Sequence, residues 1–180
     1  VIHAESGVLL VFDQERNCSR IFQNHTSTVT AMCVSDSRQR VASSDATAII
    51  VWDSTTCDQI AIYSDERQRG VFSISFSSHD EMLVAVCASK QVQTFCIWRL
   101  SRGDNAPLLV HTMTGYDRIV HCTFTGSSSK QIELFALSEK GVSFWTEQRG
   151  ALTLESCWCP PGQTLTCGAR VLDQVTAGTQ

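Results

Sequence analysis

The chain has 180 residues, of which 43% are hydrophobic, 18% charged and 8% aromatic, and this composition is typical of a globular protein with a buried core. Lys and Arg number 14 against 18 Asp and Glu, so the formal net charge of -4 excludes the basic surface that draws proteins onto nucleic acids or anionic lipids. No apolar run approaches the roughly 18 residues of a membrane-spanning helix.

Short apolar runs rich in Val, Ile, Phe, Thr and Cys follow one another along the chain, separated by clusters of Ser, Asp, Gly and Gln. None shows a convincing helical period, and runs of this kind predict β-strands. We expect strands within residues 1–13 and at 19–22, 29–35, 40–44, 48–53, 59–63, 71–77, 82–88, 93–99, 108–113, 119–125, 131–137, 141–146, 164–170 and 174–180. The predicted fold class is all-β.

An aromatic residue returns at a nearly constant interval. Phe12, Trp52, Trp98 and Trp145 occupy equivalent places near the ends of apolar runs, separated by 40, 46 and 47 residues. Each interval contains the same order of four strands, and a four-stranded unit repeated at this length is typical of the blades of a β-propeller. We expect the four rings to pack between blades rather than to form a ligand cage.

The sequence Val51-Trp52-Asp53, preceded by Asp45 and by Asn24-His25, resembles the WD-repeat family. Later motifs are degenerate, because Arg99 follows Trp98 and Thr146 follows Trp145. The resemblance implies three complete four-stranded blades plus two partial blades in one incomplete propeller domain. The expected divisions are the end of a truncated blade at 1–13, repeats at 14–53, 54–99 and 100–145, and the start of a truncated repeat at 146–180.

The ends of the chain fit a segment of a longer protein. The opening residues contain no initiator Met and no charged-then-apolar leader. Two cut blades would leave sheet faces uncovered, so we expect that this segment does not fold by itself.

His25, Ser43, Asp45 and Trp52 carry the residue types of a nucleophilic triad plus an indole. No Gly-x-Ser-x-Gly elbow surrounds Ser43, which disfavours catalysis. The resemblance to WD-repeat proteins implies a structural network instead, in which the Asp holds the His, the His meets the Ser and the Ser meets the indole. Asp45 precedes Trp52 by seven residues, one more than the usual spacing of the family. Structural roles are therefore expected for His25, Ser43, Asp45, Trp52, Asp53, Trp98 and Trp145.

The cysteines indicate a reducing compartment and no metal. Their number, nine, is odd, and four of them lie in apolar stretches where we expect buried thiols: Cys33, Cys87, Cys96 and Cys122. The only close pair is Cys157 and Cys159, and Cys167 lies eight residues further without the paired spacing of a zinc site. Phosphate-binding, HExxH and calcium-binding loops are missing from the sequence, so no cofactor is expected.

Loops at one face of the predicted propeller remain as candidates for protein binding. The connections between fourth and first strands fall at 24–28, 64–70 and 114–118. Tyr and Arg are enriched at interaction hot spots, although charged loops are often merely solvated. The candidate contact residues are Arg67, Arg69, Tyr116, Asp117 and Arg118, with Asp65 and Glu66 beside them.

Residues 25–100 resemble in particular the cilia- and flagella-associated WD-repeat proteins of the calmodulin- and spoke-associated complex. The segment from His25 to Asp36 and the strands 70–77 and 92–100 carry this resemblance. It implies a non-catalytic scaffold of the ciliary axoneme at the base of a radial spoke, with doublet microtubule and calmodulin-linked partners. An echinoderm-type microtubule-binding WD-repeat protein and a cytoplasmic substrate adaptor remain the alternatives.

Overall fold

The computed structural model describes residues 1–64, 70–89, 92–102, 105–114, 117–126 and 131–159, together with the backbone of 165–171 and 174–179. Nearly all regular structure in these residues is β-strand, and the one short helical turn is η2 (Leu100–Arg102). The predicted all-β class is confirmed. No helix within the described ranges is long and apolar enough to cross a membrane.

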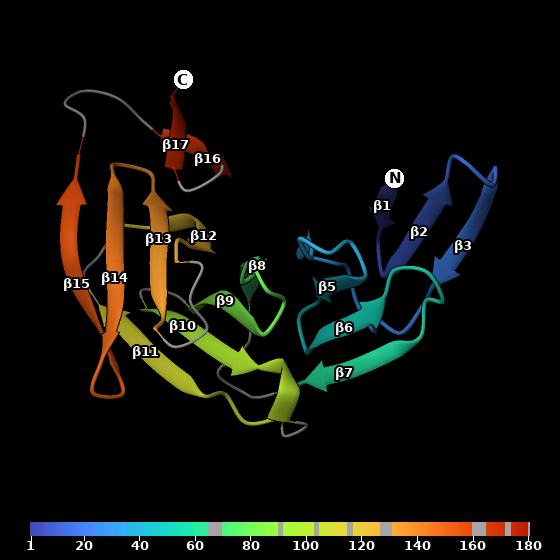
Figure 1. The fold of residues 1–180 in the computed structure, drawn as a ribbon, viewed down its shortest axis with the longest axis horizontal. Helices are drawn as coiled ribbons and strands as arrows, with labels where there is room; N and C mark the ends of the chain where they lie inside the picture. The colour runs from blue at the N-terminus through green and yellow to red at the C-terminus, as the bar shows by residue number, and fades with distance from the viewer. Residues whose placement is uncertain are drawn as a thin grey trace.

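The strands pair antiparallel with their chain neighbours into successive sheets, which we number as blades 1 to 5 (Figure 1). Blade 1 consists of β1 (Ile2–Glu5), β2 (Val8–Asp13) and β3 (Cys18–Phe22). Blade 2 consists of β4 (Ala31–Val34), β5 (Arg40–Ser44), β6 (Ile49–Asp53) and β7 (Gln59–Tyr63). Blade 3 consists of β8 (Val71–Phe76), β9 (Met82–Ser89), β10 (Val92–Arg99) and β11 (Leu109–Thr114). Blade 4 consists of β12 (Ile119–Phe124), β13 (Glu133–Ser138), β14 (Val142–Gln148) and β15 (Ala151–Trp158), and blade 5 of β16 (Leu165–Val171) and β17 (Gln174–Thr179). Three complete and two partial blades are thus present, as predicted.

Each predicted repeat contributes to two blades. Residues 14–53, for example, contain β3, the outer strand of blade 1, and then β4, β5 and β6 of blade 2. The blades follow one another along an arc, and their first strands β4, β8 and β12 lie beside one another (Figure 1). A repeat that shares its strands between neighbours ties each blade covalently to the next.

Strand β15 was not predicted. Its side chains are mostly exposed, and only Leu152 is buried, with Leu154 packed partly against the core. The hairpin turns at Arg149 and Gly150, which both have positive φ angles, of 55° and 83°. Thr153, Glu155 and Ser156 interrupt its apolar residues, so its sequence contains no apolar run like the one that predicts β7.

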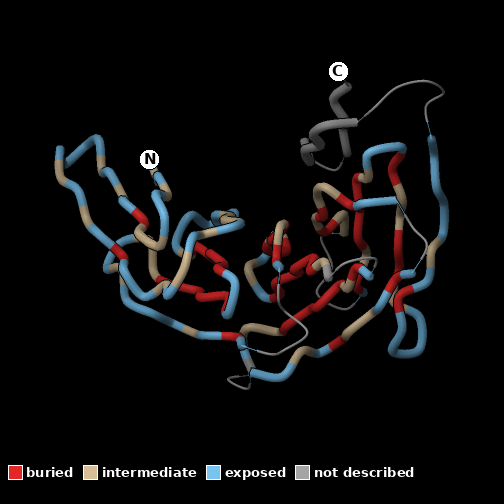
Figure 2. Tube along the Cα trace, turned by 180° about the vertical axis from the view of Figure 1, so that it is seen from behind, coloured by how far each residue is buried: buried red, intermediate tan, exposed pale blue. Residues whose placement is uncertain are grey.

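The core lies between neighbouring blades and takes its largest side chains from the third strands. The exposed fractions of Trp52, Trp98 and Trp145 are only 0%, 0% and 3%. Each of these rings packs against the outer or third strand of the preceding blade: Trp52 on Phe22, Trp98 on Tyr63 and Trp145 on Phe95. Figure 2 shows the result, with buried segments along the middle strands and exposed segments along the outer ones.

Phe12 corrects one expectation. It occupies the same place on β2 as the tryptophans on their strands, but it is 37% exposed rather than buried. Leu9 and Val11 of the same strand face blade 2 and join the cluster around Trp52. Since side chains alternate along a strand, Phe12 points to the opposite face, where the structure contains no preceding blade.

Candidate functional site

Four of the predicted site residues meet inside blade 2. His25 lies in the loop between β3 and β4, Ser43 on β5, Asp45 just after β5 and Trp52 on β6. The Nε2 atom of His25 lies 2.6 Å from Ser43 Oγ, and the Trp52 Nε1–H donates to the same Oγ at 3.1 Å. His25 Nδ1 lies 3.3 Å from Asp45 Oδ2. The arrangement links the loop before the blade to its second and third strands.

Asp45 is the centre of this arrangement. Its Oδ1 accepts hydrogen bonds from the backbone N–H groups of Thr47 and Ala48, at 2.8 and 2.9 Å. Its Oδ2 accepts from the backbone N–H groups of Thr26 and Ser27, at 2.9 and 3.3 Å. Burial by itself would raise the pKa of Asp45, but the donated hydrogen bonds, led by those from Thr47 and then Ala48 and Thr26, hold it well below its usual range. One ionised carboxylate therefore joins two loops that are distant in sequence.

The site contains a Ser, a His and an Asp in contact, but it is closed to substrates. Ser43 is fully buried, and its hydroxyl oxygen already contacts both the imidazole of His25 and the indole of Trp52. A nucleophile needs an open side and an oxyanion site next to it. The geometry instead pairs the Ser43 hydroxyl with the Trp52 indole and with His25 Nε2 inside a packed blade, where an unpaired polar group would cost about 1–3 kcal/mol.

The imidazole predicts a pH dependence of stability. Burial lowers the pKa of His25 from its ordinary value of 6.5, against the opposing effect of the Asp45 carboxylate. The unfolded chain therefore takes up a proton before the folded chain does, so stability is lost as the pH falls below about 6.5. We therefore expect the free energy of unfolding, measured with urea from pH 7.5 to pH 5, to fall less in the His25→Gln variant than in the unmodified protein. Burial also lowers the pKa values of His111 and His121, but both residues are present in the two proteins, so their contribution is the same. An equal fall in the two proteins would contradict the prediction.

Asp53 plays a different part from Asp45. It lies at the end of β6, where its Oδ1 accepts hydrogen bonds from the backbone N–H groups of Thr55 and Thr56 at 2.8 and 2.9 Å. Asp13 forms the same kind of turn in blade 1 with Glu15 and Arg16. The aspartate after the aromatic residue thus closes the turn to the outer strand in these two blades.

The equivalent residues of blades 3 and 4 lack the network. In blade 2, Ser43 lies two residues after Val41, the cross-strand partner of Trp52. Ala85 and Ala136 occupy the same position relative to Trp98 and Trp145. The Trp145 indole donates instead to Ser143 Oγ at 2.9 Å, from its own strand. Among the described residues, the buried Nε1 of Trp98 has no hydrogen-bond partner. The described residues thus satisfy this indole in two ways, in blades 2 and 4, and leave it unsatisfied in blade 3.

This difference predicts a stabilising substitution. Ala85→Ser would place a hydroxyl oxygen opposite the Trp98 indole, as Ser43 lies opposite Trp52, and we expect a gain of about 1 kcal/mol in the free energy of unfolding. Ala136→Ser is the matched control, because the indole of Trp145 already has an acceptor. The midpoints of urea unfolding compare the two. A gain that is equal in both variants, or absent in Ala85→Ser, would contradict the prediction.

The predicted contact residues are only partly described. Arg67, Arg69 and Tyr116, like Asp65 and Glu66, lie outside the described residues. Asp117 and Arg118 are exposed in the loop before β12. An ion pair of 2.9 Å joins Asp117 to Lys140, which lies in the turn between β13 and β14. The loop before the first strand of blade 4 is therefore in contact with the turn between the second and third strands of the same blade.

Gln93 is a residue that the sequence analysis missed as a support for this loop. Its side chain is 8% exposed, and its Nε2 donates to the carbonyl of Asp117 at 3.0 Å. Its Oε1 accepts from the backbone N–H of Ile119 at 2.7 Å. The only signal in the sequence is a polar residue within the apolar run before Trp98.

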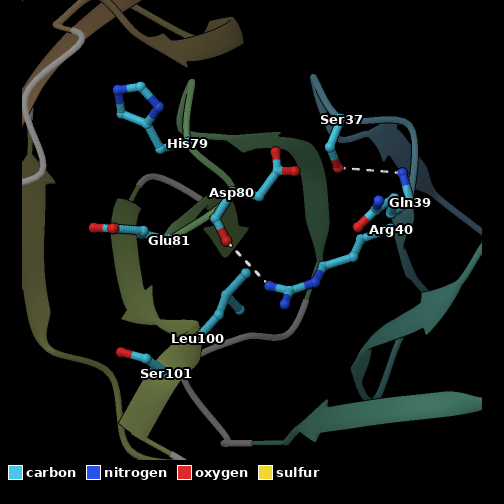
Figure 3. A pocket seen from close by; sticks show the side chains of 8 residues that line it. All are labelled: Ser37, Gln39, Arg40, His79, Asp80, Glu81, Leu100 and Ser101. Carbon is cyan, nitrogen blue, oxygen red and sulfur yellow. Dashed lines mark hydrogen bonds between the residues drawn. The ribbon is translucent and has the colours of Figure 1, made fainter.

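A pocket between blades 2 and 3 was also missed. Its volume is about 380 Å³, and it opens beside the β4–β5 turn, the β8–β9 turn and η2 (Figure 3). Arg40 reaches across it and donates from Nη1 to the carbonyl of Asp80 at 3.1 Å, whereas His79 and Glu81 point away from the guanidinium (Figure 3). The lining residues are Ser37, Gln39, Arg40, His79, Asp80, Glu81, Leu100 and Ser101. They come from separate blades, so no local pattern indicates the pocket.

The two turns that border this pocket are built alike. Ser35 and Ser77 begin them, and their hydroxyls accept from the backbone N–H groups of Arg40 and Met82 at 3.1 and 3.0 Å. The fourth residue of each turn has a positive φ angle, which is 61° at Arg38 and 55° at Asp80. The repeated serine is the signal from which the sequence could have predicted matching turns.

The eight described cysteines are free thiols. Among the described residues, no group of three or more His, Cys, Asp or Glu side chains could hold a metal ion. Cys87, Cys96 and Cys122 are buried as expected, while Cys33 is partly exposed as a residue. Burial nevertheless raises the pKa of the Cys33 thiol to about 12, so it remains protonated and inert.

Comparisons with known proteins agree with this architecture. The family model described as "WD domain, G-beta repeat" matches residues 16–53, which hold the complete network. A chain in the crystal structure of the mitotic checkpoint complex superposes with a TM-score of 0.73 and 14% identity, over 98% of this chain and 55% of that one. At this identity the likeness concerns the fold alone.

Two curated relatives carry the same name. Cilia- and flagella-associated protein 251 of Pongo abelii is 24% identical over 148 residues, and that of Mus musculus is 22% identical over 158 residues. The matches include 79% and 84% of this chain but only 13% and 12% of the relatives' length. Fold and sequence thus agree: residues 16–53 match a WD40 repeat, and most of the chain is distantly similar to Cilia- and flagella-associated protein 251.

Proposed function

We propose that the chain is part of a non-catalytic protein-interaction scaffold of the ciliary or flagellar axoneme. The observation that carries the proposal is the similarity to Cilia- and flagella-associated protein 251, which extends over four fifths of the chain rather than over one repeat. Shared repeats alone would match many propellers, whereas an alignment through several blades also includes their loops. More specifically, we propose that the protein is located in the cytoskeleton at the base of a radial spoke.

The build of the molecule supports a scaffold role. Aromatic rings are locked between consecutive blades, and the only Ser-His-Asp contact among the described residues is buried beneath an indole. A rigid fold of this kind holds its loops in fixed positions without a conformational change. This property suits a component that keeps large assemblies in register. The axonemal partners would be spoke, doublet microtubule and calmodulin-linked proteins.

Fractionation of cilia tests the proposal. Full-length tagged protein should remain with the demembranated axoneme and leave it only when salt also extracts radial spokes. A protein that is lost with the detergent-soluble fraction, or diffuse in the cytoplasm of ciliated cells, would rule out the axonemal role. Direct co-pelleting of the purified protein with microtubules would favour the echinoderm-type alternative instead.

A charge-reversal pair tests the proposed contact loop. Arg118→Glu changes the exposed loop before β12, and we expect it to weaken retention on the axoneme severalfold, because Arg is a frequent interaction hot spot. Arg16→Glu is the matched control, since its side chain is 68% exposed in the β2–β3 turn, a connection between third and fourth strands. Equal retention of both variants would remove this loop from the contact surface.

A further inference from the structure

Cys157 and Cys159 differ from the other described thiols. Both are exposed, and their Sγ atoms lie 3.8 Å apart at the end of β15. Alternate residues of a strand share a face, so both thiols point to the same side while Trp158, which is 58% exposed, points to the other. Two accessible thiols in contact can react with one another without a large movement of the chain.

The surroundings hold this pair in place. Ser143 of β14 lies opposite Cys157, and the chain then passes directly over Gly141. A Cβ atom at Gly141 would lie 2.5 Å from the carbonyl oxygen of Trp158 and 2.7 Å from Cys159 Sγ, so only glycine allows this approach. The second thiol is therefore seated on the β13–β14 turn rather than free at a chain end.

A cation lies beside the pair. Lys140 is in the same turn, and its pKa is raised mainly by the hydrogen bond to Asp117, with a smaller effect of Cys159. The thiolate is the reactive form of cysteine. Burial and the neighbouring thiol raise the pKa of Cys157, which keeps a proton on one sulfur of the pair.

The geometry points to a reversible redox site, at which glutathione disulfide or a similar small disulfide oxidises Cys157 and Cys159 to an intramolecular disulfide. One thiolate attacks a sulfur of the oxidant, which forms a mixed disulfide and releases one glutathione thiolate. The second thiol loses its proton and attacks the cysteine sulfur of the mixed disulfide, which expels the second glutathione thiolate. The protein loses two electrons and two protons, and one glutathione disulfide becomes two glutathione thiols.

The site lies next to a predicted contact residue. Lys140 holds Asp117 at 2.9 Å, and Cys159 packs on the turn that carries Lys140. Formation of the disulfide draws Cys159 towards Cys157. It therefore changes the packing on the turn whose Lys140 holds the loop of Asp117. In a reducing compartment such bonds are transient, which suits regulation rather than permanent stabilisation.

Alkylation and mass spectrometry of the full-length protein test the inference. The protein is equilibrated with mixtures of reduced and oxidised glutathione, quenched with acid, alkylated with iodoacetamide and digested. As the oxidised fraction rises, we expect the peptide with residues 157–159 to lose both alkylation sites together and to become two hydrogen atoms lighter. Cys157→Ser and Cys159→Ser should each stop at the mixed disulfide with glutathione.

Cys18→Ser is the matched control, because Cys18 is a partly exposed thiol on β3 of blade 1. This variant should lose alkylation at Cys157 and Cys159 to the same extent as the unmodified protein. Three results would overturn the inference: alkylation of both thiols at every mixture, accumulation of the mixed disulfide in the unmodified protein, or a disulfide from this peptide to another cysteine.

Discussion

Replacing Trp52 with alanine should lower the free energy of unfolding of the propeller by about 3–5 kcal/mol. Its side chain is fully buried, and its ring stacks on Phe22 with 4.8 Å between the centroids and 14° between the planes. The substitution leaves a cavity between blades 1 and 2 and removes the indole N–H that donates to Ser43. A loss of this size is a large part of the stability of a typical domain.

Ile60→Ala is the control for Trp52→Ala. Ile60 lies on β7, the outer strand of the same complete blade, and its side chain is 51% exposed. Its removal should cost much less, and urea unfolding of the full-length proteins followed by circular dichroism compares the two. If both variants lost the same stability, packing between blades would not be the reason for the aromatic repeat.

Asp45→Asn is expected to have the second largest effect, a loss of about 2–4 kcal/mol in the free energy of unfolding. The amide keeps one acceptor oxygen, but its NH2 group would face the backbone N–H groups that now donate to the other carboxylate oxygen. The position is 2% exposed, so water cannot replace the lost acceptor. The loop around Thr26 should open most readily, because it is held through this carboxylate.

The pH dependence provides a separate check on Asp45. Its pKa is held below the usual value, so it contributes stability that is fully present above the unfolded pKa of about 3.9 and is lost as the pH falls through the lower folded value. Unfolding measured between pH 6 and pH 2 should therefore show a smaller acid-side decline in Asp45→Asn. Asp53→Asn is the control, since Asp53 also accepts two backbone hydrogen bonds but lies in an exposed turn. If Asp53→Asn lowered the free energy of unfolding as much as Asp45→Asn does, burial of the carboxylate would not explain the effect.

Much of the fold could be predicted because a propeller repeats its local pattern. The aromatic residue returns once per blade, and the continuous apolar runs that end at Trp52 and Trp98 mark strands that are buried on both faces. The all-β class and the succession of blades depend only on such periodic features. β15 escaped prediction because polar residues interrupt its apolar ones, whereas the equally exposed outer strand β7 keeps a continuous apolar run.

The sites were predictable to a smaller degree. His25, Ser43, Asp45 and Trp52 were identified from their types and order, yet the sequence could not tell an open triad from a closed network. Burial of Ser43 decides between them, and burial depends on the blade that packs against β6. The pocket beside Arg40 had no signal at all, because its walls come from two turns and η2.

What the sequence determined by itself was the periodic part of the molecule: strands, blades and the ring at the end of each third strand. The tertiary structure decided which of the equivalent rings are buried, since a preceding blade covers Trp52 in this structure and none covers Phe12. It also decided that Cys157 and Cys159 meet, because the close passage of the chain over Gly141 seats the second thiol beside the first. Local patterns specify which way a side chain points, but its environment depends on chain segments that only folding brings next to it.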